Sequence, residues 1–281
     1  MAGIFGFFNY EKEGPGISKD GPKKKTFIVF FETFFRNFWK FIVVNFVYCL
    51  FSLPVLTNGL ASAGITNVTR NIARDKHSFG TSDFIDTVKK NWKQALPAGI
   101  INTVIYMIMG FDIYYFITLD KGIVATIGFG ISVCMLFIFT IMKYYMWTLL
   151  ITFKFKLKQI YKNSFKFVFA NLKMNLLCFF VILLVYAVFI AIPFLFQNYF
   201  FVIIPFELVI YILAFPCFRY LLVQYCTFPA IKKYIIDPYY AEHPGEDIEK
   251  RKSLGLEVEE KTKTDSKNDD EEEESENIFE D

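Results

Sequence analysis

The chain has 281 residues, of which 54% are hydrophobic and 20% aromatic, and it carries a formal net charge of +2. The apolar residues stand in long blocks of the kind that bilayer-spanning helices require, so an ordinary soluble globular domain is excluded. Lys and Arg flank these blocks and do not cover one soluble face. We therefore expect the lipid bilayer as a partner and no nucleic acid.

The first 40 residues predict an irregular segment followed by an interfacial helix. Residues 1–25 are rich in Gly, Pro and Lys, and they contain no apolar core long enough for a cleavable signal. Residues 26–40 are aromatic and carry charges at intervals, which is typical of a helix at the membrane interface. We expect a retained first span to direct insertion.

Six blocks along the chain predict an all-α membrane protein with about six transmembrane helices, arranged as hairpins with cytoplasmic amphipathic interfacial helices. The second block, 57–75, is rich in small residues and only weakly hydrophobic, so we interpret it as a span buried inside the protein. The alternative for this block is a helix that lies in the membrane surface. We place the spans at about 38–56, 57–75, 96–117, 122–150, 174–196 and 199–226.

Two amphipathic segments, 82–95 and 151–173, precede the third and fifth spans. The first segment places its apolar side chains on one helical face and most of its lysines elsewhere, which favours an interfacial helix. Parts of the two segments align at an offset of 80, which indicates a repeated unit of an interfacial helix and a hairpin. A third, weaker copy at 36–42 is either part of this repeat or a chance similarity. Identical residues stand at Val88 and Val168, Asn91 and Asn171, Lys93 and Lys173, and Leu96 and Leu176.

The distribution of charge indicates the orientation and the domain limits. Residues 70–93 and 154–173 each hold six Lys or Arg, whereas the turns on the opposite side hold almost none. Basic loops stay in the cytoplasm, so both termini are expected there. Residues 237–281 hold 18 acidic and 6 basic side chains and are expected to form a disordered acidic tail. The transmembrane domain is then 26–236.

Ionisable side chains inside the predicted spans are the candidate functional residues. Glu207, between two prolines of the sixth span, and Asp112, in the outer half of the third, stand at similar depth and would form a site if their helices faced each other. The alternative is a protonated or hydrogen-bonded Glu207 that fixes helix packing. Lys143 and Arg219 lie in the inner parts of their spans, and we expect both to extend toward cytoplasmic headgroups.

The sequence contains no recognised catalytic, nucleotide-binding or metal-binding motif. It has no GxxxxGK[ST], HExxH or GxSxG pattern, and its GFGIS at 128–132 lies within a predicted span. The five Cys form no CxxC pair, and we interpret them as small apolar residues of the spans. We therefore expect no enzyme activity, no cofactor and no metal.

Two stretches of sequence carry a family resemblance, NFVYCLFSLPVLTNGLASAGITNVTRNIARDK at 45–76 and FIDTVKKNWKQALPAGII at 84–101. Their characteristic residues are Ser52, Leu53, Pro54, Gly59, Arg70, Arg74, Asn91, Trp92 and Lys93. In these residues the chain resembles the YesL-type family of bacterial membrane proteins, a family of unknown molecular function. The resemblance extends over roughly residues 4–225. It implies a protein of the bacterial plasma membrane with an accessory role in carbohydrate uptake. The insert at 14–25 and the acidic tail depart from shorter members.

These features lead to two functional hypotheses. The first is a non-enzymatic accessory or regulatory membrane protein associated with carbohydrate uptake. It would contact a carbohydrate transporter component or a sensor kinase through its cytoplasmic helices and tail. The second is a small transporter or channel in its own right, as a homo-oligomer, that uses the intramembrane carboxylates Glu207 and Asp112.

Overall fold

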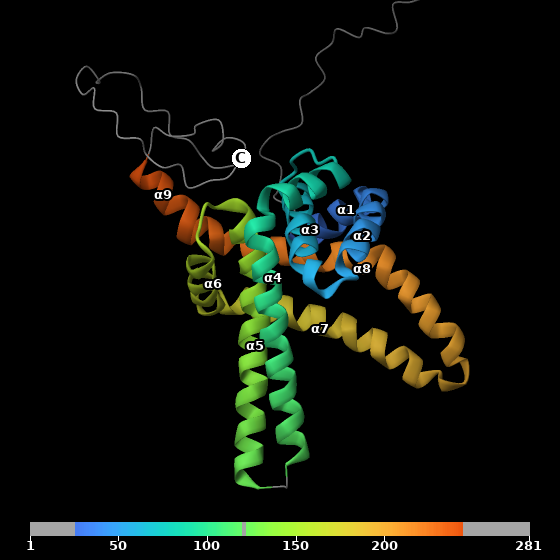
Figure 1. Cartoon of the computed structure of the whole chain (residues 1–281). Helices are drawn as coiled ribbons and strands as arrows, with labels where there is room; N and C mark the ends of the chain where they lie inside the picture. The colour runs from blue at the N-terminus through green and yellow to red at the C-terminus, as the bar shows by residue number, and fades with distance from the viewer. Residues whose placement is uncertain (1–25, 120–121, 244–281) are drawn as a thin grey trace, which may run out of the picture.

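The computed structural model describes residues 26–119 and 122–243, so the expectations for 1–25 and for most of the acidic tail lie outside the described residues. Within the described ranges the chain is helical and has no strand, which confirms the predicted all-α class (Figure 1). The α-helices are α1 (Thr26–Arg36), α2 (Phe38–Ser52), α3 (Asn58–Ala73), α4 (Thr81–Thr118), α5 (Ile123–Thr152), α6 (Leu157–Ala170), α7 (Leu172–Leu195), α8 (Phe200–Ile231) and α9 (Asp237–Glu242). Short 3₁₀ segments are η1 (Val55–Thr57) and η2 (Gln197–Tyr199), and a π-helical segment, η3 (Lys232–Ile236), follows α8.

Four helical segments of the described chain are long and apolar enough to cross a membrane, so this is a multi-pass membrane protein. They are α4, α5, α7 and the segment Gln197–Glu242 that contains α8. The first two of the six expected spans correspond to α2, a shorter apolar helix, and to α3. At 1.5 Å per residue the 16 residues of α3 extend about 24 Å, which is less than the ~30 Å hydrocarbon core.

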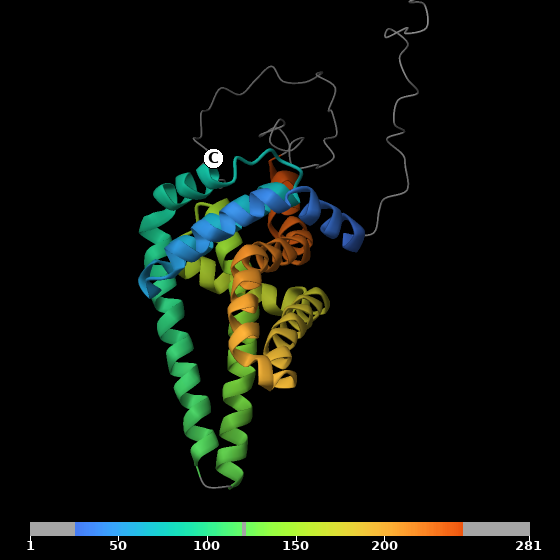
Figure 2. The same ribbon diagram turned by 90° about the vertical axis from the view of Figure 1, so that its right-hand side faces the viewer.

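The long helices form two hairpins that project from a compact group of shorter helices. In Figure 1 the α4–α5 hairpin points downward, whereas the α7–α8 hairpin points to the side. In Figure 2, α1 and α2 cross the molecule obliquely near the opposite end of the α4–α5 hairpin. The hairpin tips are therefore free of the shorter helices, which gather around the other ends of α4, α5 and α8.

Helix α4 joins two elements that the sequence separates, the interfacial segment 82–95 and the span 96–117. The structure has one continuous helix from Thr81 to Thr118, with Pro97 inside it. Figure 2 shows that the first turns of this helix lie at a wide angle to the rest. A proline lacks the N–H that would continue the helical ladder, and its ring crowds the preceding turn, so helices bend near it. The break expected between the segments 82–95 and 96–117 is therefore a bend within one helix.

Buried residues divide each hairpin into two parts. In α5 every residue from Tyr145 to Thr152 is buried, and the buried residues of α8 all lie at or after Phe215. We call 103–138 and 183–214 the outer parts of the two hairpins, and in their described residues only Ala125 and Ser132 are buried. The remaining lengths of α4, α5, α7 and α8 are the inner parts, which pack with α3 and the other short helices.

The small residues of α3 allow this helix to pack between the inner parts of α4, α5 and α8. Eleven of its 16 residues are buried, and it packs against α2, α4, α5 and α8. A Cβ built on Gly59 would meet the carbonyl oxygen of Ala95 and lie 2.7 Å from the Cα of Gly99. Only glycine permits backbones to approach this closely, which explains the weak hydropathy that the sequence shows for this helix.

A buried amide fastens α2 to α8. Asn45 Nδ2 donates a hydrogen bond to the carbonyl oxygen of Leu213 at 2.8 Å, and Asn45 Oδ1 accepts one from the N–H of Cys217 at 2.8 Å. In a regular helix these two backbone groups, four residues apart, would bond to each other. Pro216 lies between them. The Asn45 side chain therefore bonds to two backbone groups of the α8 turn that contains Pro216.

The predicted repeat appears as a shared order of elements. The first copy runs through α4 and α5, and the second through α6, α7 and α8. The second copy breaks at Asn171, whose Nδ2 donates to the carbonyl oxygen of Cys226 at 3.1 Å. The weaker copy at 36–42 covers the junction of α1 and α2, which breaks at Asn37.

The end of the helical domain differs slightly from the expected limit. The sequence places the polar tail from 237 onward, but residues Asp237–Glu242 form α9, and Tyr240 is buried. This short helix follows η3 and α8 directly, so the helical domain continues six residues past the expected limit before the described chain ends at His243.

Candidate functional site: a cationic cavity between the hairpins

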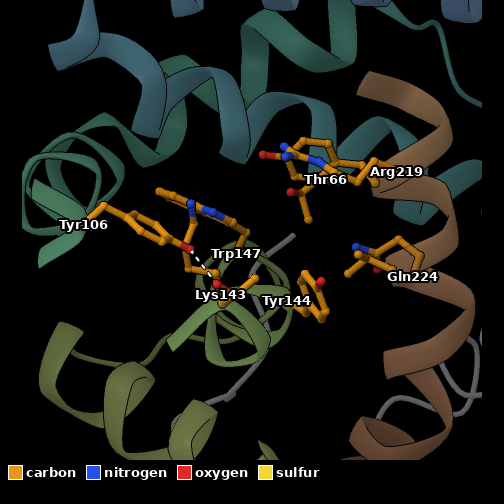
Figure 3. A pocket seen from close by; sticks show the side chains of 10 residues that line it. Thr66, Tyr106, Lys143, Tyr144, Trp147, Arg219 and Gln224 are labelled. Atoms are coloured by element: carbon orange, nitrogen blue, oxygen red, sulfur yellow. Dashed lines mark hydrogen bonds between the residues drawn. The ribbon is translucent and has the colours of Figure 1, made fainter. Parts of the chain in front are cut away.

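A cavity of about 80 Å³ lies where α3, α4, α5 and α8 meet (Figure 3). A single water molecule takes up about 30 Å³ of liquid, so the cavity has room for a few waters or one small polar group. Most of the residues around it carry a charge, a hydroxyl, an amide or an aromatic ring. They are Thr66, Tyr106, Thr140, Lys143, Tyr144, Trp147, Arg219, Tyr220, Val223 and Gln224.

Two cations from different hairpins face this cavity. The ammonium of Lys143 lies 4.5 Å from the ring centroid of Tyr106, and the guanidinium carbon of Arg219 lies 4.8 Å from that of Tyr220. Arg219 Nη1 also donates to the hydroxyl of Tyr186 at 3.3 Å. Rings and a hydroxyl attract a cation only partly, and no Asp or Glu is among the described residues that line the cavity. The described lining of the cavity therefore has two basic side chains and no carboxylate.

Other lining groups have unused hydrogen-bonding capacity. Trp147 Nε1 is buried and has no hydrogen-bond partner within the part of the chain that the structure describes. Gln224 Nε2 donates to Thr148 Oγ1 at 3.0 Å, whereas its Oε1 is buried and has no partner among the described residues. Buried donors without acceptors are costly, and buried cations without counter-ions are more so. A small anion in the cavity would accept hydrogen bonds from Lys143, Arg219 and Trp147 and reduce both costs.

Counted along their own helices, the two basic residues lie at similar distances from the hairpin tips. Lys143 lies about 30 Å from the start of α5, and Arg219 lies about 28 Å from the start of α8, both starts being at hairpin tips. The hydrocarbon core is about 30 Å thick. If both tips reach one face of the membrane, the cavity lies at the boundary of the other face. We call that face the basic side, because residues 70–93 and 154–173 belong to it.

The two carboxylates expected to form a site lie elsewhere. Asp112 is near the tip of the α4–α5 hairpin and Glu207 near the tip of the α7–α8 hairpin. Figures 1 and 2 both show these tips apart, so the structure does not bring the two residues together. Glu207 is half-buried, and its Oε1 has no hydrogen-bond partner among the described residues. A functional role for either carboxylate stays a prediction.

The residues of the family-like motif shape the turn and the packing of α2, α3 and α4. Gly59 is the close contact with α4, and Asn91 is buried and donates to the carbonyl oxygen of Thr87 at 3.1 Å. Ser52, Leu53 and Pro54 form the turn after α2, while Trp92 and Lys93 are exposed on α4. None of these seven residues lines the cationic cavity.

The sequence identifies Lys143 and Arg219 as basic residues within spans but does not predict that they share a cavity, because each helix alone gives no sign of the other. One signal connects them. A basic residue followed by tyrosine occurs at 143–144, 219–220 and 233–234, and the first two pairs are 76 residues apart. This is close to the offset of 80 between the amphipathic segments, so each repeat carries the pair on its returning helix. The convergence of the two pairs on one cavity is visible only in the structure.

Comparison with known proteins gives one partial match. A family described as "Protein of unknown function, DUF624" matches residues 41–113, which run from α2 through most of α4. This range includes both stretches on which the resemblance in the sequence rests. No curated protein and no solved structure matches the chain.

Proposed function

We propose that this protein is a non-enzymatic membrane protein that binds a small anionic group, a carboxylate or a phosphate, in the cationic cavity. The observation that supports the proposal is the convergence of Lys143 and Arg219 on one cavity whose lining has no carboxylate. Near the edge of the bilayer core, two uncompensated cations would be strongly unfavourable, and an anion would offset that cost. The unpartnered N–H of Trp147 supplies a further donor.

The proposal includes an orientation and a location. We propose that the basic side faces the cytoplasm, because Lys and Arg concentrate in the loops of that side. Both termini then lie in the cytoplasm, and the cavity opens near the inner leaflet. The YesL-type resemblance, which overlaps the DUF624 match, supports a bacterial plasma membrane.

The accessory role in carbohydrate uptake is part of the same proposal. Its support is the family resemblance, together with the amphipathic helices and acidic tail that a transporter component or sensor kinase would contact on the cytoplasmic side. Co-purification from native membranes tests it. Enrichment of such a partner over an unrelated membrane protein with four spans is the expected result, and equal recovery from both baits would remove the support for an accessory role.

The anion-binding proposal can be tested with the fluorescence of Trp147. The chain has three Trp, and Trp39 and Trp92 are 81% and 52% exposed. Replacing these two by Phe leaves Trp147, which is 4% exposed, as the only Trp. Iodide is an anion that quenches indole fluorescence, so it should quench Trp147 more strongly than the neutral quencher acrylamide. Acetate or phosphate should compete with iodide.

Variants of the two cations make this test specific. In the single-Trp protein, Lys143→Gln or Arg219→Gln removes one charge-assisted contact and should lower the affinity for iodide by about tenfold. Acrylamide quenching should change little. Lys89→Gln is the matched control, because this exposed lysine lies outside the cavity. The proposal fails if iodide quenches all three variants and the parent protein equally.

A transporter or channel is the second candidate. The observation in its favour is Glu207 Oε1, which is buried without a partner in a helix that contains three prolines. Broken or bent helices with a buried carboxylate are common around transport sites. Uptake of a labelled substrate into proteoliposomes should then fall on Glu207→Gln. Equal uptake by this variant, or no uptake by the wild type, counts against transport.

A further inference from the structure

A second cavity, of about 170 Å³, lies next to the cationic cavity, and Gln224 lines both. Its walls come from the start of α1, the last turn of α3 and the end of α8, and they include Thr26, Arg70, Ala73, Arg74 and Phe228. Again none of the described residues that line it is Asp or Glu. The two cavities therefore share one lining residue, the uncharged Gln224, and each is lined by basic side chains.

The second cavity continues the first toward the basic side. On α8, Phe228 lies about 13 Å beyond Arg219, counted away from the hairpin tip. On α3, Arg74 lies about 12 Å beyond Thr66, which lines the first cavity. Helices α3 and α8 pack against each other. Along both helices the lining residues thus lead from the cationic cavity to the end of the bundle where the basic loops are.

Arg74 has the properties of a ligand-binding group. Its guanidinium carbon lies 4.3 Å from the ring centroid of Phe228, and its Nη2 is buried without a hydrogen-bond partner in the described chain. Burial, with the nearby charge of Arg70 as a second cause, lowers the pKa of Arg74 below its ordinary value. A cation at the end of α3 stabilises the helix dipole. That effect accounts for the charge of Arg74, but it does not account for a buried N–H without an acceptor.

Arg70 holds the neighbouring charge in place. Its Nη1 donates to Thr152 Oγ1 at 2.7 Å, and its Nη2 donates to Asn67 Oδ1 at 2.7 Å. These contacts connect the end of α3 to the end of α5. Arg70 therefore holds the ends of α3 and α5 together beside the second cavity, while Arg74 has an N–H without a partner among the described residues.

We infer that the second cavity is the entrance to the first, and that a soluble anion passes Arg74 and Gln224 from the basic side to reach Lys143 and Arg219. This inference rests on the proposed function. A small carboxylate or phosphate fits the path better than a lipid headgroup does, because the path runs between α3 and α8 inside the protein, and a headgroup would have to bring its acyl chains with it. Gln224, which lines both cavities, has one amide atom with a partner and one without a partner among the described residues.

The test uses the full-length single-Trp protein in nanodiscs of neutral lipid. Arg74→Gln should lower iodide quenching of Trp147 by at least about threefold and leave acrylamide quenching unchanged, because it removes only the charge on the path. Arg74→Lys keeps the charge and should restore iodide quenching. Ala73→Phe should lower quenching by both iodide and acrylamide, because it fills the entrance. Lys89→Gln is again the charge control.

The possible results distinguish the proposed entrance from the proposed binding site. If Lys143→Gln and Arg219→Gln weaken iodide quenching but Arg74→Gln and Ala73→Phe do not, the entrance is wrong and the binding site stands. If iodide shows no preference for the parent protein over the Lys143 and Arg219 variants, both proposals fail. A further measurement of iodide quenching uses nanodiscs that contain the anionic lipid phosphatidylglycerol. Competition by this lipid without competition by free phosphate would overturn the soluble route, because it identifies a lipid headgroup as the ligand.

Discussion

The outer and inner parts of the two hairpins belong to the same helices but are stabilised by different surroundings. In the outer parts, large apolar side chains such as Phe111, Ile190 and Phe206 are more than 60% exposed. In the inner parts, buried amides, hydroxyls and cations pack against the short helices. Lipid therefore surrounds the outer half of each long helix, whereas other helices of the protein surround the inner half.

This division decides which residues can be changed at low cost. An exposed apolar residue of the outer parts contacts lipid, which adapts to a changed side chain. A residue of the inner parts contacts other side chains and backbone at close-packed density, so a small change in volume or polarity has no room to relax. Three predictions test the division, in order of decreasing effect.

The largest effect is expected from one methyl group at the contact of α3 and α4. Gly59→Ala places a Cβ against the backbone of Ala95 and Gly99, which cannot give way as a flexible side chain would. We expect a loss of about 3 kcal/mol in the free energy of unfolding, the upper range for overpacking. Thermal unfolding in detergent, followed by circular dichroism, measures it.

Gly110→Ala is the matched control in the outer part of α4. A Cβ at Gly110 would meet no atom of the described chain within 4 Å. Alanine is favoured over glycine in a helix by about 1 kcal/mol, so this variant should be as stable as the parent protein or slightly more stable. Equal melting temperatures for the two alanine variants would contradict the division between inner and outer parts.

A smaller loss of stability is expected when the Asn45 amide, which bonds to the backbone of α8, is removed. Asn45→Leu leaves the carbonyl of Leu213 and the N–H of Cys217 without their partner, at a cost of about 2 kcal/mol. Asn198→Leu, in the turn at the hairpin tip, is the control and should change the unfolding temperature little. A fully stable Asn45→Leu protein would mean that Leu213 and Cys217 close the helical ladder by themselves.

The sequence predicted the outer parts well because hydropathy and length determine them. The expected limits 174–196 and 199–226 agree with α7 and α8 within a few residues, apart from the longer end of α8. The turn at 197–198 falls in η2. Lipid is a uniform solvent, so a local apolar run is sufficient information for such a helix.

The inner parts were harder to predict because their partners are distant in the sequence. Asn45 lies in an apolar block that gives no sign of its acceptor, Leu213, 168 residues later. Lys143 and Arg219 were interpreted as cations that extend to headgroups, since each helix alone allows it. Their convergence depends on how α5, α8 and α3 pack together, which no local pattern specifies. Only the repeat, with its two pairs of a basic residue and tyrosine, connects them in sequence.

The smallest effect is expected from the carboxylates of the outer parts. Glu207 lies about 18 Å from Arg219 along α8, and Asp112 is near the opposite hairpin tip, so neither should influence an anion in the cavity. Asp112→Asn and Glu207→Gln should each leave iodide quenching of Trp147 within about 1.5-fold of the parent protein. The same two variants should lower substrate flux if the outer parts of the hairpins form a transport path. A change in quenching as large as that of Lys143→Gln would show that the two parts of the hairpins are coupled, and the anion site would then extend toward the tips.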